Sequence, residues 1–213
     1  MKSIYLSLLI SIFMLSNLFA QELNDIKLPE PQKTGGKPLM ETLDQRQTTR
    51  DFNNEDFSLQ EISNLLWAAF GVNRADIGKR TAPSARNRQE VDIYIATKTG
   101  IYIYDAFSNK LKFIKDGDYR KYMGKQDFVS KAPIVLIYIA DYSKLGNDLS
   151  DTRKAFYTGT SAGYISQNVY LFAASEGLAT VVLGAIDHDK ISEVLGLNHN
   201  QVVLLSQAIG YKN

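Results

Sequence analysis

Two arginines and two hydroxyl side chains lie close together between Arg46 and Arg50. The guanidinium groups stand four residues apart, with Thr48 and Thr49 between them, where a short amphipathic helix should end. Guanidinium groups bind phosphate through charge-assisted, often bidentate hydrogen bonds, and hydroxyl groups add direction. The segment is therefore a candidate phosphate clamp. Taken alone, the ordinary interpretation is the stronger one: an arginine-rich helix end with a Thr/Asp cap.

A second polar cluster follows about one helix later, in the loop Pro83–Gln89. Pro83 and Ser84 are ordinary residues of a turn leading into a strand. A plain turn does not explain Asn87 and Gln89, because their amides each offer both donors and an acceptor. We interpret this loop as a second candidate for contact with a polar ligand.

A third candidate lies near the C-terminus, where an apolar strand ends in Leu183, Gly184 and Ala185. Glycine permits close approach of the backbone to a planar ring. It is equally compatible with a plain bend at a strand end. This segment therefore gains weight only in combination with the other two.

The composition excludes several kinds of chemistry. The chain of 213 residues has no cysteine, which excludes disulfides, thiolate metal sites and thiol nucleophiles. Its two histidines, His188 and His199, are too few for a multi-histidine centre, so we expect no metal site. A formal net charge of +1, without any Lys/Arg run, predicts no nucleic-acid partner. The length suits one domain with a sizeable core.

The N-terminus has the pattern of a secretory signal peptide. Lys2 precedes a short apolar run, and small residues lead to a cleavage site after Ala20. The alternative is an uncleaved membrane anchor, which is less favoured because the run is short and contains serines. We therefore expect residues 1–20 to direct export to the periplasm, with no integral membrane segment left after cleavage. Residues 21–37 are then a polar linker or extended arm, and residues 38–213 are the folded domain.

Periodicity and capping residues predict the elements that must position the three clusters. Ser58 and Glu61 form a capping box, and Gly177 is a typical residue to end a long helix. The apolar run 133–140 predicts a central strand buried on both faces. The predicted helices cover residues 39–45, 59–70, 151–176 and 190–195. The predicted strands cover residues 90–97, 101–105, 110–114, 133–140, 178–183 and 202–209. The fold class is therefore α+β, with helices around a mixed sheet.

A stripe of small residues runs along one part of the predicted long helix 151–176. Its members are Ala155, Gly159, Ala162, Gly163 and Ser166. Such a stripe permits the close approach of another helix, either inside the domain or across a dimer interface.

Taken together, the three clusters resemble the nitroreductase superfamily of FMN-dependent oxidoreductases, over about Pro38 to Tyr211. Arg46–Phe52 is similar to the family's Arg-x-Ser/Thr-x-Arg-x-Phe motif, and Arg80–Gln89 is similar to its Pro-Ser-Ala-x-Asn-x-Gln segment. Gly177–Asp187 is similar to the family segment in which a strand passes the flavin ring. Within the superfamily, the compact length and the run Arg80–Arg86 look closest to the SagB-type dehydrogenase branch.

The resemblance implies a nitroreductase-like α+β domain that binds FMN as a homodimer. It implies FMN phosphate and ribityl contacts from Arg46, Gln47, Thr48 and Arg50, contacts from Pro83, Ser84, Ala85 and Asn87 of the partner subunit, and ring contacts from Leu183, Gly184 and Ala185. The similarity of Gly177–Asp187 to the family segment further implies that the Gly184 N–H points at flavin N5. Family members also carry basic residues beyond the last strand, where this chain has only Lys212. We therefore expect the phosphate to depend on Arg46 and Arg50, with Arg86 or Arg88 as a further candidate.

The implied activity is transfer of hydride or two electrons between flavin N5 and a small organic substrate. No side chain stands out from the sequence as an obligatory acid or base. An exported enzyme would not meet cytosolic NAD(P)H, so we expect another electron donor or direct oxidation of an organic substrate. The SagB-type resemblance favours the second, because relatives in that branch dehydrogenate azoline rings in peptides. The alternative is a catalytically degenerate flavin-binding or interaction protein.

Overall fold

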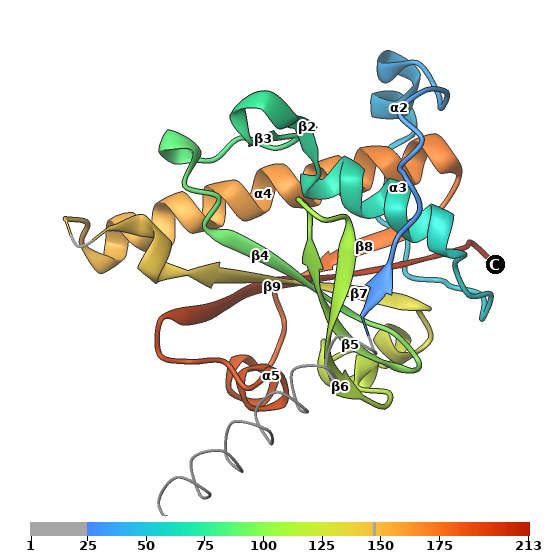
Figure 1. Ribbon diagram of the computed structural model, residues 1–213. Helices are drawn as coiled ribbons and strands as arrows, with labels where there is room; N and C mark the ends of the chain where they lie inside the picture. The colour runs from blue at the N-terminus through green and yellow to red at the C-terminus, as the bar shows by residue number, and fades with distance from the viewer. Residues whose placement is uncertain (1–24, 147) are drawn as a thin grey trace, which may run out of the picture.

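Seven strands form the central sheet, in the order β1-β6-β5-β4-β7-β9-β8 (Figure 1). The computed structural model describes residues 25–146 and 148–213, so the signal peptide expected at residues 1–20 lies outside the described part. The strands of this sheet are β1 (Ile26–Lys27), β4 (Val91–Ala96), β5 (Gly100–Asp105), β6 (Lys110–Asp116), β7 (Ile134–Asp141), β8 (Ala179–Leu183) and β9 (Gln201–Gly210). A separate two-stranded ribbon consists of β2 (Val72–Arg74) and β3 (Lys79–Arg80).

All strand pairings in the central sheet are antiparallel, so the prediction of a mixed sheet is wrong in this detail. The connection from β7 to β8 explains the difference. These two strands run in the same direction and are joined by a long helix, as in a parallel crossover. However, β9 lies between them and pairs antiparallel with both. The α+β class itself is confirmed.

In the described part of the chain, four α-helices accompany the sheet: α2 (Leu39–Gln45), α3 (Leu59–Phe70), α4 (Asp151–Glu176) and α5 (His188–Leu195). The predicted capping box is present, with the Ser58 side chain accepting from the Glu61 N–H and the Glu61 side chain accepting from the Ser58 N–H. Gly177 ends α4 in the left-handed region at a φ of 72°. The predicted start and end signals of these helices are thereby confirmed.

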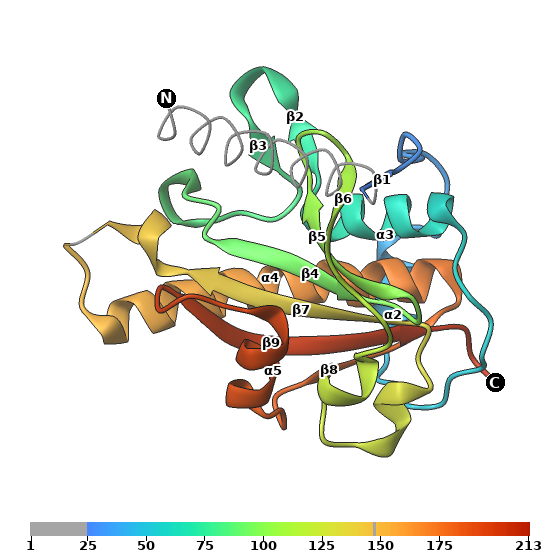
Figure 2. The same ribbon diagram turned by 60° about the horizontal axis from the view of Figure 1, so that its bottom comes forward.

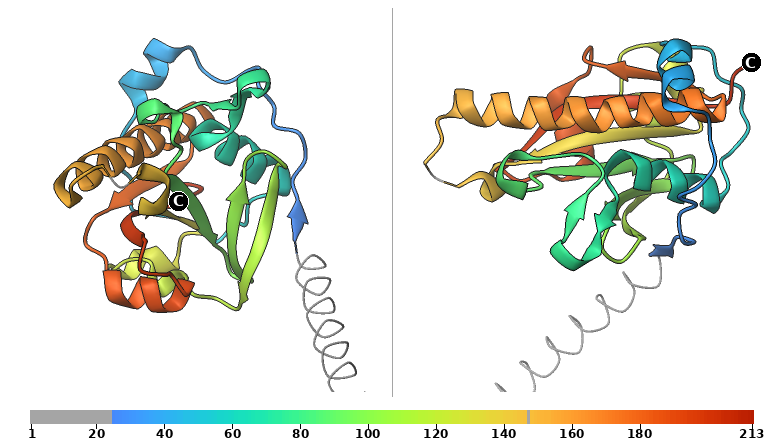
Figure 3. Two further views of the ribbon diagram at one scale, coloured as in Figure 1. Left: turned by 60° about the vertical axis from the view of Figure 1, so that its left-hand side comes forward. Right: turned by 90° about the horizontal axis from the view of Figure 1, so that it is seen from above.

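The helices cover both faces of the sheet. On one face, α3 and α4 pack over a core that includes Leu65, Ile165 and Tyr138. On the opposite face, α5 and the turns after β6 pack over a second core that includes Ile191 and Met123. Figures 2 and 3 show the sheet between these two layers. Strand β7 is buried on both sides, as its apolar sequence predicts.

The segment expected to be a linker contributes to the fold from Ile26 onwards. β1 pairs with β6 through Ile26 and Lys27. Leu28 is only 3% exposed and belongs to the core beneath α3. The Ser63 hydroxyl of α3 donates to the Pro29 carbonyl at 2.5 Å. The polar composition of residues 21–37 conceals these few anchoring positions, which is why the sequence suggests a tether there.

Among the described residues, no helix combines the length and the apolar character needed to cross a membrane.

Candidate functional site

The segment Arg46–Arg50 leaves α2 and runs beside β8, the last strand of the sheet. The Thr49 N–H donates to the Thr180 carbonyl at 3.0 Å. The Thr48 hydroxyl lies 3.2 Å from the Tyr170 hydroxyl, and the Arg46 guanidinium lies 5.4 Å from the centre of the Tyr170 ring. Thr48 and Arg46 are candidate site residues from the sequence, whereas no sequence signal points to Tyr170, which lies in the C-terminal part of α4.

A cavity of about 300 Å³ opens beside Arg46. Its lining residues are Lys37, Asp44, Gln45, Arg46, Gln47, Ala174, Gly177 and Lys212. The lining thus contains three cationic side chains and only one carboxylate, and this excess of positive charge suits an anionic ligand. The C-terminal Lys212 lines the same cavity as Arg46, whereas Arg50 is exposed and lies outside this lining. The two arginines are equal candidates from the sequence alone, but in the structure only Arg46 lines the cavity.

The free edge of β8 carries a row of backbone polar groups directed away from the sheet. The Thr180 carbonyl accepts from Thr49, and the Val182 N–H donates to the Tyr170 hydroxyl at 3.0 Å. Alternate residues of an edge strand face the same way, so the N–H of Gly184 is the next member of this row. Among the described residues no hydrogen bond to that N–H is found. Gly184 therefore presents an unused donor at the strand end.

Gly184 also leaves open space in front of the backbone. A Cβ atom built there would meet only the Leu205 Cδ2 atom, at 3.9 Å. Nothing in the protomer's own packing therefore requires glycine at this position. Leu183 is buried beneath it, and the Ala185 carbonyl accepts from the Lys125 N–H at 3.2 Å. The third predicted cluster is thus an exposed strand end, with a loop from the β6–β7 connection beside it.

That neighbouring loop carries Gln126, which the sequence analysis did not identify. The Gln126 Oε1 atom is buried and has no hydrogen-bond partner among the described residues. A Cβ built on Gly124 would meet both Gln126 Oε1, at 3.5 Å, and Leu183 Cδ1, at 2.9 Å, which places this amide beside the β8 end. A buried acceptor without a donor is costly, and such a group suits a ligand that brings an N–H.

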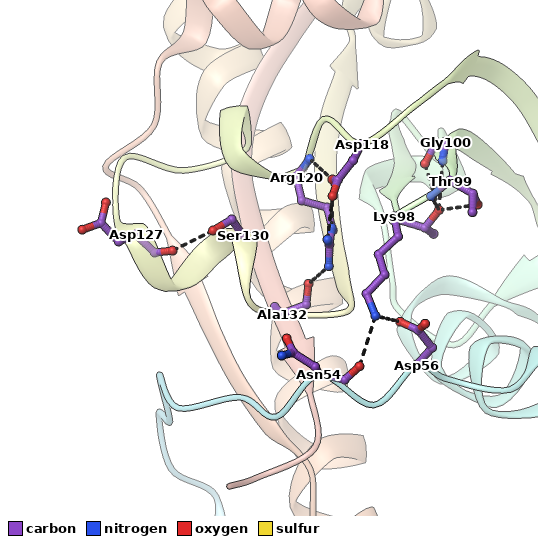
Figure 4. Close-up of polar contacts among 11 residues, drawn as sticks. Asn54, Asp56, Lys98, Thr99, Gly100, Asp118, Arg120, Asp127, Ser130 and Ala132 are labelled. Carbon is purple, nitrogen blue, oxygen red and sulfur yellow. Dashed lines mark hydrogen bonds and ion pairs between the residues drawn. The ribbon is translucent and has the colours of Figure 1, made fainter.

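Arg120 braces this loop (Figure 4). Its guanidinium binds both Asp118 oxygens, at 2.9 and 2.6 Å, and donates to the Ala132 carbonyl at 2.7 Å. The hydrogen bonds from Arg120 lower the pKa of the Asp118 carboxyl. Arg120 is only 6% exposed, whereas Asp118 lies at the surface, so a buried guanidinium anchors the loop to an exposed carboxylate and to the Ala132 carbonyl.

The loop Pro83–Gln89 has a strained backbone. Arg86, Asn87 and Gln89 all adopt positive φ angles, of 55°, 54° and 51°. The Ser84 hydroxyl accepts from the Gln89 N–H at 2.9 Å and holds the loop closed. Strain of this kind persists only where the surroundings enforce it, and it is concentrated at functional segments.

Side-chain contacts fix the base of the same loop. The Gln89 amide accepts from Arg80 at 2.7 Å and donates to the Gly78 carbonyl at 2.6 Å. Burial lowers the pKa of Arg80, whose guanidinium lies 4.4 Å from the centre of the Phe70 ring. Pro83 and Asn87 remain exposed at the tip, whereas Ser84 and Ala85 are half-buried. The tip is therefore free to meet a ligand or another chain.

The structure brings the first and third clusters together but not the second. The clamp and Gly184 both lie along β8, where Thr180 is level with Ile134 at the start of β7. The loop 83–89 leads into Val91, which pairs with Ala140 near the end of β7. At about 3.4 Å per residue, the loop is about 20 Å from the level of the clamp along the strand. Gly184 lies nearer to the level of Ala140, but β7 and β9 separate β4 from β8, which is about 14 Å across the sheet at about 4.8 Å per strand. One protomer therefore does not hold all three clusters around one ligand.

The nitroreductase family model matches residues 43–211, which is most of the chain and includes all three clusters. The chain belongs to the nitroreductase family. A curated nitroreductase relative from Methanocaldococcus jannaschii is 31% identical over 191 residues, covering 85% of this chain and 94% of that protein. The chain is thus similar to that relative over nearly its whole length.

Solved structures agree with this membership. A crystal structure of a nitroreductase from Ralstonia eutropha has a TM-score of 0.84 at 38% identity, covering 89% of this chain and 90% of the other. The NADPH:FMN oxidoreductase from Vibrio harveyi, complexed with NAD+, has a TM-score of 0.62 at 22% identity, covering 82% of this chain and 69% of the other. The second likeness concerns the fold alone.

Membership of the nitroreductase family supports a general flavin-dependent oxidoreductase that acts on small molecules, in a family whose members are commonly dimeric. The residues present fit a flavin. Gly184 offers an unused N–H and open space for a planar ring, and Gln126 offers a buried acceptor without a donor. The cationic cavity at Arg46 suits a terminal phosphate.

Proposed function

We propose that this protein is an exported, FMN-dependent oxidoreductase that moves hydride or two electrons to or from a small organic substrate. The observation that carries the proposal is the edge of β8, where a phosphate-type clamp and an unused backbone donor lie on one strand. Arg46 contacts the strand's neighbour Tyr170, and Gly184 presents its N–H two residues beyond Val182.

The roles of the protein residues follow from their chemistry. Arg46 and Lys212 would hold the phosphate by charge, and the Thr48 hydroxyl would add a directional hydrogen bond. The Gly184 N–H would donate to the flavin N5 atom, and the Gln126 Oε1 atom would accept an N–H from the ring's polar edge. The flavin, when bound, supplies the hydride or two-electron chemistry.

We propose further that two copies of the chain complete the site. The outer face of α4 exposes Phe156 and Tyr164, which are 62% and 47% exposed. Gly159 and Gly163 lie on the same helix with nothing within 4 Å of an added Cβ, so another helix could approach closely there. A two-fold partner across α4 would supply the loop 83–89 to the clamp that its own protomer cannot reach.

Mixing two inactive variants tests this arrangement. We expect Arg46→Ala and Asn87→Ala each to lose activity, because each removes one part of every site. In a mixed dimer, one of the two sites receives both wild-type parts. Refolding or subunit exchange of an equal mixture should therefore restore roughly a quarter of the wild-type flavin-dependent activity, since about half the dimers are mixed.

The control for this experiment is a mixture of Arg46→Ala with Lys212→Ala. Both of these changes lie on the clamp side, so their mixed dimers contain no intact site, and mixing should add no activity beyond the average of the two separate variants. If the Arg46→Ala and Asn87→Ala mixture also stays inactive while subunit exchange is demonstrated, the shared site is ruled out.

The electron donor is the finer part of the proposal. A signal peptide at residues 1–20, as the sequence pattern predicts, would direct the enzyme out of the cytosol and away from NAD(P)H. Together with the resemblance to SagB-type dehydrogenases, this favours direct oxidation of an organic substrate over use of a nicotinamide. The named activity of the Vibrio harveyi protein argues the other way, although its likeness to this chain is one of fold.

Stopped-flow absorbance of the FMN-loaded protein tests both parts. We expect the purified chain to bind FMN and to show no rapid bleaching with NADH or NADPH, but full bleaching with dithionite. Rapid, saturable bleaching at micromolar nicotinamide would overturn the proposed donor and leave the oxidoreductase intact. Failure to bind FMN at all would overturn the function itself and favour a degenerate interaction protein.

A further inference from the structure

Tyr170 joins the two ends of the candidate flavin site through one hydroxyl group. Its Oη atom accepts from the Val182 N–H at 3.0 Å and lies 3.2 Å from the Thr48 Oγ1 atom. The side chain is 8% exposed, and its ring lies beneath the Arg46 guanidinium. No other described side chain contacts the clamp and the β8 edge together through a single polar atom.

The direction of these hydrogen bonds has a chemical consequence. A backbone N–H can only donate, so Val182 uses the Tyr170 oxygen as an acceptor. The phenol keeps its own proton and a further lone pair, so it can either donate to Thr48 Oγ1 or accept from it. If Thr48 accepts that proton, its own hydroxyl hydrogen is free to point away from Tyr170, towards the space that the clamp faces.

Tyr170 also supplies the hydrogen-bond acceptor that a neighbouring strand would otherwise provide for Val182. Val182 belongs to an edge strand, and its outward N–H would meet only water without the phenol. Gly184 follows two residues later and faces the same way. Holding Val182 therefore fixes the position of the Gly184 N–H relative to Thr48 and Arg46.

We propose that Tyr170 is a positioning residue for the cofactor. It orients the Thr48 hydroxyl as a donor to the phosphate end of FMN, and it holds the β8 edge in register with the clamp. This inference rests on the proposed FMN-dependent function. It goes beyond that function because it assigns the site's internal alignment to a helix residue outside all three sequence clusters.

A double-mutant cycle tests the assignment, with FMN affinity measured by flavin fluorescence on the full chain. Tyr170→Phe keeps the ring beneath Arg46 and removes only the hydroxyl. Each of Tyr170→Phe and Thr48→Val should weaken FMN binding about tenfold, in line with the loss of one effective hydrogen bond. If Tyr170 acts through Thr48, the double variant should also lose about tenfold. Independent, merely structural effects would multiply to about a hundredfold.

The matched control is Tyr157→Phe, which removes a phenol hydroxyl from the same helix. This hydroxyl accepts a hydrogen bond from the exposed Arg153 and not from the clamp or β8. The Tyr157→Phe substitution should leave FMN affinity unchanged. Equal FMN affinity of Tyr170→Phe and wild type would overturn the positioning role, and multiplicative losses in the double variant would overturn the part of it that acts through Thr48, while the proposed function stands. Absence of FMN binding by the wild-type chain would instead defeat the proposed function.

Hydrogen exchange on the wild-type chain keeps the inference testable should Tyr170→Phe fail to fold. The Val182 amide should be protected in the FMN-free protein, because the phenol covers an outward N–H of an edge strand. Rapid exchange at Val182, with protection retained at the inward-facing Val181 amide, would show that the bond does not hold the strand.

Discussion

Replacing Arg46 with alanine is expected to weaken FMN binding by about a hundredfold, since hydrogen bonds to charged groups contribute about 1.5–3 kcal/mol each. Arg46 lines the cationic cavity together with Lys212 and stacks on Tyr170. Its loss leaves the phosphate with Lys37 and Lys212, whose ammonium groups cannot bind it through a planar, bidentate fork. Riboflavin lacks the phosphate, so its weaker affinity should change little in the same variant. Equilibrium titration of both ligands, followed by flavin fluorescence, provides the measurement.

Arg153→Ala provides the charge-matched control for that experiment. Arg153 is exposed at the start of α4, and its side chain bonds to Tyr157. The Arg153→Ala substitution removes the same charge from the protein without changing the cavity, so FMN affinity should stay within about twofold at moderate ionic strength. An equal loss of FMN affinity in both variants would mean that overall charge, and not the cavity at Arg46, attracts the ligand.

Replacing Gly184 with proline should lower flavin-dependent turnover by about a hundredfold, because loss of a single preorganised donor at a reacting centre costs about 10²–10³. Proline removes the N–H that we assign to flavin N5. It sacrifices no hydrogen bond found among the described residues, and edge strands tolerate proline. The protein should therefore fold and keep most of its FMN affinity. Turnover at saturating flavin and the apo-protein melting temperature are the two measurements.

Gly184→Ala separates the N–H from the missing side chain. Alanine keeps the N–H, and its Cβ would meet only Leu205 within the protomer. We expect turnover within a few fold of wild type. Comparable losses in the alanine and proline variants would show that open space, and not the donor, is what the site requires at Gly184.

Local signals explain why much of the fold could be predicted from the sequence. The Ser58–Glu61 capping box and Gly177 act within one helical turn, so neighbouring residues suffice to identify them. The continuous apolar sequence of β7 is sufficient to predict that this strand is buried on both faces. The antiparallel pairing could not be predicted in this way, because it depends on β9 inserting between two strands that precede it in the chain.

The candidate site likewise contains residues that a local sequence pattern identifies and residues that only the folded structure identifies. Arg46 and Thr48 form a spaced pattern within one segment, so their chemistry is visible in the sequence. Tyr170 and Gln126 are single residues in α4 and in the β6–β7 connection, and they matter because folding brings them to β8. The outward direction of the Gly184 N–H likewise depends on the register of β8 against β9. The roles of the proposed flavin contacts remain predictions.

The position of β8 at the end of the strand order links ligand binding to solubility. An outermost strand with free backbone groups is a template on which another chain can add a strand. Here Thr49 and Tyr170 occupy two of those groups, and the proposed flavin would occupy the next, at Gly184. The opposite outermost strand, β1, has only two residues and offers little to pair with. The proposed binding site would thus also block the addition of another strand at this edge of the sheet.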